Sequence, residues 1–449
     1  MTIRSGMFLF SLAILLFFIV IPACAEESSV IETGYTYVDG DSCDVFTYPA
    51  VDKFSHIGLS GGKVAYSKDK DPLIYIWDSG TGETKTFDTT VIAEKKDDWI
   101  SFWMDIECLD ISNGVVYYSL DVDQTTPTGT SASSKGLFSF DGENNENIIS
   151  QHFIDELLAD NDLVLVKDFS DFDGEPHIEN MRLRVYSHDS GVIITIDNRT
   201  HISDPIGFGE YKVAILADGM NIPVRSDARL PSDGIVVFDL APALRGGEVG
   251  QIVIPGATDL SSNEKVDVSQ DCFSDRYFVW MKGLKTVNGG EDQYQCKLYA
   301  TDLITLENTV LATRDDISFW LYAYAVNGDY LVYKNEGKIF LYHIPDGERK
   351  EIRITGNDEF EVGDIVEFDE GQLLVRAYPK EYSGYEPNKY EIWFVDLNPF
   401  VNPVEAGDTE IAMAGSNEPG NPETPLSPVV SVFALLTAVT LFAGSQGKR

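Results

Sequence analysis

Two groups of residues in this chain have side chains that bind metal ions or form covalent links. The first is the acidic stretch Asp168-Phe-Ser-Asp-Phe-Asp-Gly-Glu175, in which Asp168, Asp171, Asp173 and Glu175 stand around one glycine. Carboxylate oxygens and a glycine at a sharp turn are what a calcium loop needs. Because the spacing differs from that of an EF-hand, an ordinary acidic turn accounts for the same residues. Calcium is the only cofactor that the sequence suggests.

The second group is the cysteines. Once an N-terminal signal is removed, four remain, Cys43, Cys108, Cys272 and Cys296. An even number in an extracytoplasmic chain predicts disulfides, although four cysteines allow three pairings. Cys272 and Cys296 flank one predicted strand and its hairpin, so we expect that bridge first, and Cys43 with Cys108 by elimination. Buried thiols are the alternative, and no pair has the close spacing of a zinc site.

Other candidate chemistry is sparse, and we expect no catalytic and no cofactor-binding residues. Six histidines are scattered without metal-ligand spacing, and neither a Gly-x-Ser-x-Gly elbow nor a phosphate-binding loop occurs. Asn198-Arg-Thr200 is the one N-glycosylation sequon. Trp99, Trp103 and Trp320 lie where two innermost strands are expected to begin. They can wedge between neighbouring sheets, or face a ligand from a channel rim.

The elements that would position these residues are short β-strands that recur about every fifty residues from Asp52 to Asn398. The clearest copy is Ile57–Tyr66, Leu73–Asp78 and Ser79–Phe87, which reads as four strands joined by tight turns. Gly-Gly and Asn-Gly between alternating apolar residues are strong hairpin signals, because such turns need positive φ. Repeated blocks of four strands predict an all-β fold, a β-propeller.

Pairing the second and third strands of each block gives seven blades of four antiparallel strands, although six or eight fit the irregular third and fourth blocks. The second strands are predicted at Lys63–Tyr66, Val115–Ser119, Leu163–Val166, Tyr211–Leu216, Tyr277–Met281, Tyr330–Tyr333 and Gln372–Tyr378. The seventh block lacks a convincing outer strand. We therefore expect the N-terminal stretch Tyr35–Tyr48 to supply it and close the ring.

The repeat resembles the TolB-like and WD-repeat-like propellers of bacterial and archaeal envelopes. The resemblance lies in the turn Ser60-Gly-Gly-Lys-Val-Ala-Tyr66 and in Leu73-Ile-Tyr-Ile-Trp-Asp-Ser-Gly-Thr-Gly82. It covers roughly Asp52 to Asn398 and matches no family-specific functional residue. It implies the fold strongly and the function weakly, since propellers serve both as binding modules and as enzymes.

The two ends of the chain predict a location outside the cell. Residues 1–25 contain a basic residue, an apolar run and the cleavage pattern of a secretion signal, with cleavage after Ala25; lipidation of Cys24 is the alternative. The ectodomain is expected over 26–400, a Pro- and Asn-rich stalk over 401–428, and an apolar anchor or sorting segment over 429–449. The spacer, short apolar run and terminal Lys-Arg resemble the C-terminal signals of archaeal surface proteins. The resemblance implies attachment to the membrane.

The composition of the chain limits the classes of partner that it can bind. The 449 residues include 73 acidic and 33 basic side chains, a net charge of −40. Nucleic acids are excluded, because their binding depends on Lys and Arg that neutralise phosphates. We expect a surface-anchored, non-catalytic propeller that binds proteins or glycans of the envelope. The alternatives are an extracellular lyase or hydrolase, whose acid and base would converge only in space, and a structural unit of a surface layer.

Overall fold

The computed structural model describes fifteen stretches of the chain, all within one compact unit that ends at Pro403. The described stretches are 29–38, 56–68, 71–92, 101–126, 129–150, 152–169, 181–197, 203–218, 223–224, 228–229, 233–258, 260–288, 291–316, 324–380 and 390–402. The predicted signal, stalk and anchor segments lie outside these stretches, apart from the first two residues of the stalk. Among the described residues, none forms a helix with the length and hydropathy needed to cross a membrane.

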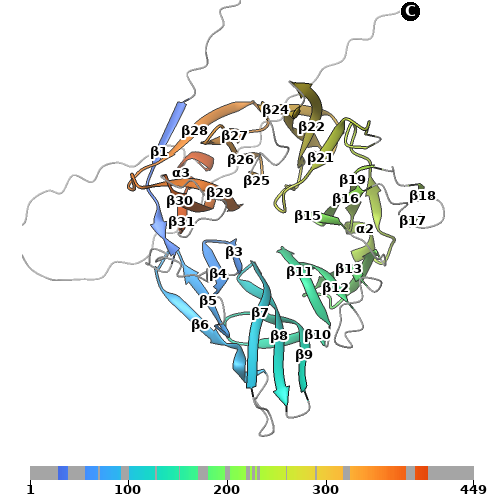
Figure 1. Ribbon diagram of the computed structural model, residues 1–449, viewed down its shortest axis with the longest axis vertical. Helices are drawn as coiled ribbons and strands as arrows, with labels where there is room; N and C mark the ends of the chain where they lie inside the picture. The colour runs from blue at the N-terminus through green and yellow to red at the C-terminus, as the bar shows by residue number, and fades with distance from the viewer. Residues whose placement is uncertain are drawn as a thin grey trace, which may run out of the picture. The chain divides into compact units, whose positions relative to one another are not determined.

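Seven antiparallel sheets, here called blades 1 to 7, form the fold (Figure 1). Blade 1 has β3 (His56–Ser60), β4 (Lys63–Ser67), β5 (Leu73–Asp78) and β6 (Thr84–Asp88); blade 2 has β7 (Ser101–Ser112), β8 (Val115–Thr126), β9 (Gly129–Phe140) and β10 (Asn145–Ser150). Blade 3 has β11 (Phe153–Asp160), β12 (Leu163–Phe169), β13 (Met181–Ser187) and β14 (Ile193–Asp197); blade 4 has β15 (Ser203–Gly209), β16 (Lys212–Asp218), β19 (Asp233–Asp239) and β20 (Gly250–Ile252). In each sheet, successive strands pair with one another.

The remaining blades follow the same order. Blade 5 has β21 (Glu264–Asp267), β22 (Tyr277–Asn288), β23 (Glu291–Asp302) and β24 (Asn308–Asp316); blade 6 has β25 (Tyr324–Asn327), β26 (Tyr330–Asn335), β27 (Lys338–His343) and β28 (Glu348–Ile354). Blade 7 has β29 (Phe360–Asp369), β30 (Gln372–Pro379) and β31 (Glu391–Asp396). Short elements complete the structure: β17 (Pro223–Val224), β18 (Ala228–Arg229), η2 (Thr89–Val91), α2 (Ala241–Leu244) and α3 (Asn398–Val401).

The N-terminal residues close the ring, as predicted, and they do so with two strands. β2 (Thr36–Tyr37) pairs antiparallel with β31 and becomes the fourth strand of blade 7. β1 (Ser29–Thr33) pairs in parallel with β28, from Ser29 opposite Lys350 to Thr33 opposite Ile354, and adds a fifth strand to blade 6. The sequence did not predict β1. All-β architecture with seven blades of four antiparallel strands is confirmed, and the fold is a β-propeller.

The middle strands of the blades are the core, and all seven predicted second strands are confirmed within one residue at their starts. In β30, Leu373, Leu374 and Val375 are all fully buried, because both faces of a blade pack against its neighbours. Aromatic rings fill the wedge between blades, as between Trp77 of blade 1 and Phe394 of blade 7, whose centroids are 5.4 Å apart. The second strands of blades 2 and 5 are longer than predicted, and they and the third strands of these blades have twelve residues each.

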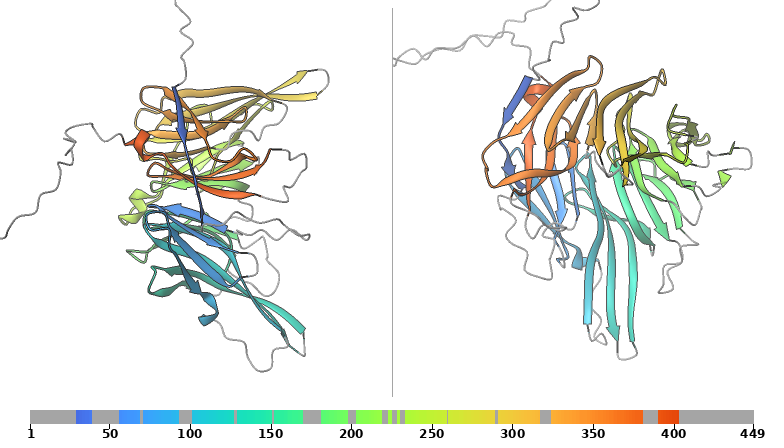
Figure 2. Two further views of the ribbon diagram at one scale, coloured as in Figure 1. Left: turned by 90° about the vertical axis from the view of Figure 1, so that its left-hand side faces the viewer. Right: turned by 45° about the horizontal axis from the view of Figure 1, so that its top comes forward.

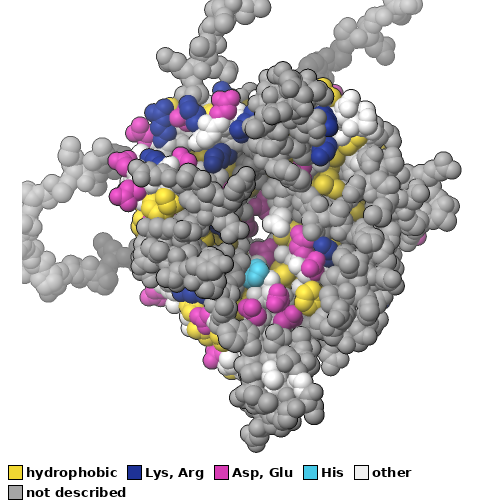
Figure 3. Space-filling model, in the orientation of Figure 1, with side chains coloured by type: hydrophobic (Ala, Val, Ile, Leu, Met, Phe, Trp, Pro, Cys, Tyr) yellow, Lys and Arg dark blue, Asp and Glu magenta, His cyan; other side chains and the backbone are white. Residues whose placement is uncertain are grey.

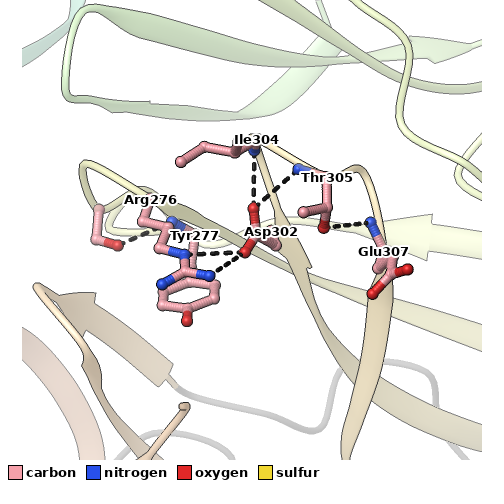
Figure 4. Close-up of polar contacts among 7 residues, drawn as sticks. Arg276, Tyr277, Asp302, Ile304, Thr305 and Glu307 are labelled. Carbon is pink, nitrogen blue, oxygen red and sulfur yellow. Dashed lines mark hydrogen bonds and ion pairs between the residues drawn. The ribbon is translucent and has the colours of Figure 1, made fainter. Parts of the chain in front are cut away.

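One turn motif joins the third and fourth strands of several blades. In blade 5, Asp302 Oδ1 accepts the backbone N–H groups of Ile304 (2.8 Å) and Thr305 (3.0 Å), and Oδ2 accepts two bonds from the Arg276 guanidinium (Figure 4). In blade 1, Asp78 accepts from Gly80 and Thr81 in the same way. In both blades the carboxylate thus fixes the turn at an Asp-x-x-Thr sequence.

The two turns differ at the residue that follows the threonine, and this difference is testable. Gly82 has φ +70°, whereas Leu306 has φ +58° at the equivalent place. A left-handed conformation costs a non-glycine residue about 1–2 kcal/mol. We expect Gly82→Leu to lower the free energy of unfolding by about that amount, measured by urea denaturation. Leu306→Gly should raise it by less, since glycine also gains entropy in the unfolded chain. Equal effects of the same sign would contradict this account.

Candidate functional site

The innermost strands of the blades surround a central channel. β3, β7, β11 and β15 contact one another in order, and β25 contacts β29, which in turn contacts β3. Figure 3 shows the hollow at the centre of the ring with acidic side chains around it. Three adjoining cavities of about 390, 90 and 620 Å³ lie along it, and the smallest shares lining residues with both of the others.

The two larger cavities lie at opposite mouths of the channel. The first, here called the hairpin-face mouth, contains the carboxylates of Glu107, Asp110, Asp155, Glu156, Asp271 and Glu367, together with His56 and Arg376. The second, here called the turn-face mouth, is lined by the turns after the inner strands. It contains Asp160, Glu210, Asp275, Asp369 and Glu370, with Lys63. Carboxylates therefore dominate both mouths.

A repeated hydrogen bond joins neighbouring blades beside the turn-face mouth. In four blades the last residue of the inner strand accepts the backbone N–H of the first turn residue in the next blade. The four bonds run to Ser60 Oγ from Asn113 (3.1 Å), to Asp160 Oδ2 from Glu210 (2.6 Å), to Asn327 Oδ1 from Glu370 (3.3 Å) and to Asp369 Oδ2 from Gly61 (2.9 Å). We call these four acceptors the latch residues.

Two further carboxylates form a second row, deeper in the channel. Asp110 and Glu367 occupy equivalent positions, each two residues before the end of its inner strand. Asp110 Oδ2 accepts the N–H of Ala159 in blade 3 at 2.7 Å, and Glu367 Oε2 accepts the N–H of Leu59 in blade 1. The latch residue Asp369 and the deeper Glu367 thus both join blade 7 to blade 1, where the ring closes.

Blade 5 is joined to its neighbours differently. Along the channel wall, backbone bonds join it to both neighbours, from Phe208 N–H to the Gln270 carbonyl at 3.0 Å and from Val326 N–H to the Asp271 carbonyl at 3.0 Å. Tyr324 Oη of blade 6 also accepts the Ser269 N–H at 2.9 Å. The Asp271 side chain extends from this wall, and none of the described residues donates a hydrogen bond to its carboxylate. Every junction in the ring therefore has at least one hydrogen bond beside the channel.

Burial in the channel wall favours the neutral form of the deep carboxyls. It raises the pKa of Asp110 from 3.8 to about 7, although the N–H groups of Ala159 and Ile111 oppose the rise. Burial, and then the charges of Asp110 and Asp369, raise the pKa of Asp271 to about 8.

The same causes act on the neighbouring groups. Burial and the charges of Asp110 and Asp271 raise the pKa of Glu367 well above its ordinary value. Burial also raises the pKa of Asp160 and of Asp369, and it lowers the pKa of His56, whose charged form is the cation. The deep channel is therefore a cluster of acids that hold protons near neutral pH.

Comparisons with known proteins leave the function open. No family model matches the chain, and no curated protein matches it. Among solved structures, the chain is similar to an oligogalacturonate lyase from Vibrio parahaemolyticus (13% identity, 82% of this chain and 98% of that one, TM-score 0.42). It is also similar to the β-propeller domain of the Trilobed protease from Pyrococcus furiosus (11%, 80% and 98%, TM-score 0.42). A third is the Cps50 propeller from Myceliophteria thermophila (13%, 79% and 99%, TM-score 0.34). At these identities and TM-scores the likeness carries no argument about what this chain does.

The predicted calcium residues are placed only at Asp168. This carboxylate is fully buried on β12, where it accepts from Arg184 Nε at 3.0 Å and lies 2.5 Å from His152 Nδ1. It therefore serves an ion pair inside blade 3. Asp171, Asp173 and Glu175 lie outside the described residues, and no metal-binding group of three or more His, Cys, Asp or Glu side chains occurs among those described.

The expected bridge between Cys272 and Cys296 is wrong, because both residues, like Cys108, are buried thiols. Cys272 Sγ lies against Gly207 of blade 4, so close that a methyl group there would be 2.2 Å from it. Cys296 lies on β23, opposite Gly283. Nearness in sequence did not reveal that Cys272 is directed toward the neighbouring blade. Cys43 lies outside the described residues, so its expected pairing remains a prediction.

Several other predicted positions also lie outside the described part. These are Trp99, Trp320, Asn198 and the side chain of Trp103, although Trp103 belongs to inner strand β7 as expected. Asp315 and Asp316, which shortly precede Trp320 in the sequence, end the outer strand β24.

The channel acids were not predicted, yet the sequence contains a signal for them. Asp160 and Asp369 each directly precede a turn after an inner strand, and Ser60 and Asn327 take the same place in other copies. Alignment of the copies on these turns would have shown a polar residue repeated at one position. The fold brings that position to the channel, where the side chains can latch blades, attract cations or exchange protons.

Proposed function

We propose that this protein is an extracytoplasmic, surface-displayed binding propeller that holds a cationic segment of an envelope protein or glycan at the hairpin-face mouth. The observation that carries the proposal is the cavity of about 390 Å³ at that mouth, where six acidic residues and one arginine are among the described lining. Because the three deep acids hold protons near neutral pH, its negative charge rests on Glu107, Asp155 and Glu156. Clefts lined by charge of one sign concentrate ligands of the opposite sign. A ligand amine or guanidinium would complement this lining, whereas an anionic glycan would be repelled.

The hairpins around this mouth support a binding role. In blade 2 the strands β8 and β9 pair as far as Thr126 opposite Gly129, and in blade 5 β22 and β23 pair as far as Asn288 opposite Glu291. Figure 2 shows the long hairpins of both blades extending on the same side of the ring. They are the second-to-third-strand hairpins, and the inner strands begin on that side. An extended ligand that reached the cavity would therefore pass between raised walls.

The location belongs to the same proposal and is supported by the sequence. A secretion signal over 1–25 and an apolar segment over 429–449 flank the propeller. A net charge of −40 also suits a surface domain that must stay soluble beside other acidic polymers.

Calorimetric titration of the full chain with four probes tests the proposal. The probes are hexalysine, a chitosan oligomer, a neutral glucan oligomer and an oligouronate. We expect hexalysine or chitosan to bind, with an affinity that falls as salt rises. The double change Glu107→Gln and Glu156→Gln should weaken this binding roughly thirtyfold, since each of the two lost charge pairs contributes on the order of 1 kcal/mol.

Asp275→Asn with Glu370→Gln is the matched control, because it removes the same charge from the turn-face mouth. This control should bind like the unchanged protein. Loss of binding in the control alone would move the ligand to the turn-face mouth and overturn the assigned site. Tight binding of the oligouronate, or no binding of either cation, would overturn the proposal as a whole.

A second candidate, an acid–base enzyme acting on a glycan, is favoured by one observation. Asp110, Asp271, Glu367 and His56 share the hairpin-face cavity, and the pKa of each carboxyl is raised by burial. General acid catalysis needs a carboxyl that keeps its proton near neutral pH. Mass spectrometry of the same glycan probes after incubation would decide. Products that disappear with Glu367→Gln would favour the enzyme, and unchanged glycans would favour the binding module.

A further inference from the structure

We propose that the channel wall is a proton-dependent clasp, in which the ring is closed most tightly while Asp110, Asp271 and Glu367 are neutral and loosens at two junctions when they ionise. The clasp is a property of the fold and does not depend on the proposed ligand. The two junctions are those between blades 2 and 3 and between blades 7 and 1. They are the places where a deep carboxyl accepts the N–H of the next blade.

The geometry leaves Asp110 little freedom to move away from the other two carboxyls. Asp110 is held at both oxygens, by Ile111 N–H at 2.8 Å and by Ala159 N–H at 2.7 Å. Gly58 of blade 1 lies directly behind it. Because these contacts are part of the blade junctions, a carboxylate can retreat from its neighbours only if the junction itself opens.

Among the described residues that line this cavity, Arg376 is the one basic side chain other than His56. The charges that raise the pKa values of these three groups are all carboxylates, from Asp110, Asp160, Asp271 and Asp369. The other charged or titratable side chains described in their cavity come from β3, β7, β11 and β30; they are His56, Glu107, Cys108, Asp155, Glu156 and Arg376. Burial lowers the pKa of His56, so it stays neutral as the carboxyls ionise.

The sign of the pH dependence follows from these shifts. A carboxyl whose pKa is raised by folding binds more protons in the folded than in the unfolded chain. Its stabilising contribution is complete below its ordinary pKa of 3.8 and is lost as pH rises to about 7 for Asp110 and about 8 for Asp271. In that window each such group lowers the folding equilibrium constant about tenfold per pH unit.

Urea denaturation of the full chain between pH 4 and 9, at constant ionic strength, tests the clasp. The folding equilibrium constant of the unchanged protein should fall with rising pH. Asp271→Asn replaces the group that receives no hydrogen bond from the described residues by a neutral side chain of the same shape. For this variant, the folding equilibrium constant should fall with pH less steeply than for the unchanged protein. The difference should be about one factor of ten per pH unit between pH 4 and 8. Glu143→Gln removes an exposed carboxyl from the turn between β9 and β10 and should leave the slope unchanged.

Hydrogen exchange then separates opening of the clasp from a general loss of stability. After correction for the intrinsic rate, the Leu59 and Ala159 amides should lose protection above pH 7 before the Val64 amide, which lies in the middle strand β4. Equal loss at all three would overturn the clasp. So would identical slopes for the unchanged protein and Asp271→Asn. If Asp271→Asn does not fold, Glu367→Gln replaces it in the titration, with the same expected and contradicting outcomes.

Discussion

Gly58→Ala should destabilise the ring more than any other single methyl group added to blade 1. A methyl group at Gly58 would lie 2.4 Å from Asp110 Oδ1 and 3.2 Å from the Ile111 nitrogen. The carboxylate cannot turn aside without breaking its bonds to Ile111 and Ala159. Overpacking together with a lost buried hydrogen bond predicts a decrease in the free energy of unfolding of about 3 kcal/mol. Urea denaturation measures it.

Gly34→Ala is the control for this change. Gly34 lies between β1 and β2, and no atom would lie within 4 Å of the added methyl group. This variant should unfold within about 0.5 kcal/mol of the unchanged protein. If Gly58→Ala were equally harmless, blades 1 and 2 would have to be further apart than the structure places them. The role of Asp110 at the junction with blade 3 would then also be in doubt.

Removal of β1 and β2 should have the larger effect, because it opens the ring. A chain that lacks residues 1–37 loses five backbone pairs to β28 and two to β31. It also loses Ile31, which is 3% exposed, and Tyr35, whose ring stacks on Trp393 at 4.2 Å. A buried isoleucine and a stacked tyrosine together contribute several kcal/mol, so we expect a loss of at least about 4 kcal/mol.

The matched control is a chain that lacks only residues 1–28, which keeps both strands. The free energy of unfolding measures the difference, and light scattering reports association through the uncovered edges of blades 6 and 7. The control should behave as the full chain does. The opposite result would be a chain lacking residues 1–37 that is as stable and as soluble as this control. That result would mean that the hydrogen bonds of Glu367 and Asp369 to blade 1 close the ring without the N-terminal strands.

The propeller was predictable because its blades are local structures. Each hairpin is specified by its own turn, such as Gly61-Gly62 or Asn327-Gly328, and the alternation of apolar residues gives the strands. β1 could not be found in the same way. Its partner β28 lies more than 300 residues away, and no turn connects the two.

The channel acids were missed for a related reason. Asp110 and Glu367 belong to different copies of the repeat and meet only because the ring brings their strands to one axis. Single carboxylates in acidic segments carry no sign of this. The predicted disulfide between Cys272 and Cys296 was wrong for a similar reason. The direction of the Cys272 side chain depends on blade 4 and on the space at Gly207. Sequence patterns indicate how neighbouring strands of one blade pair. They did not reveal these residues, because these residues make their contacts between different blades.

The unequal junctions around blade 5 mean that cold and alkali would stress different parts of the ring. Its two channel-wall junctions have backbone bonds and the apolar packing of residues such as Phe273 and Phe278, whereas four of the others have a latch residue. Apolar packing weakens on cooling, while ionisation affects the carboxylate junctions. A ring assembled from similar four-stranded blades thus contains junctions of two kinds. A cold environment would select against mutations at one kind, and an alkaline environment would select against mutations at the other.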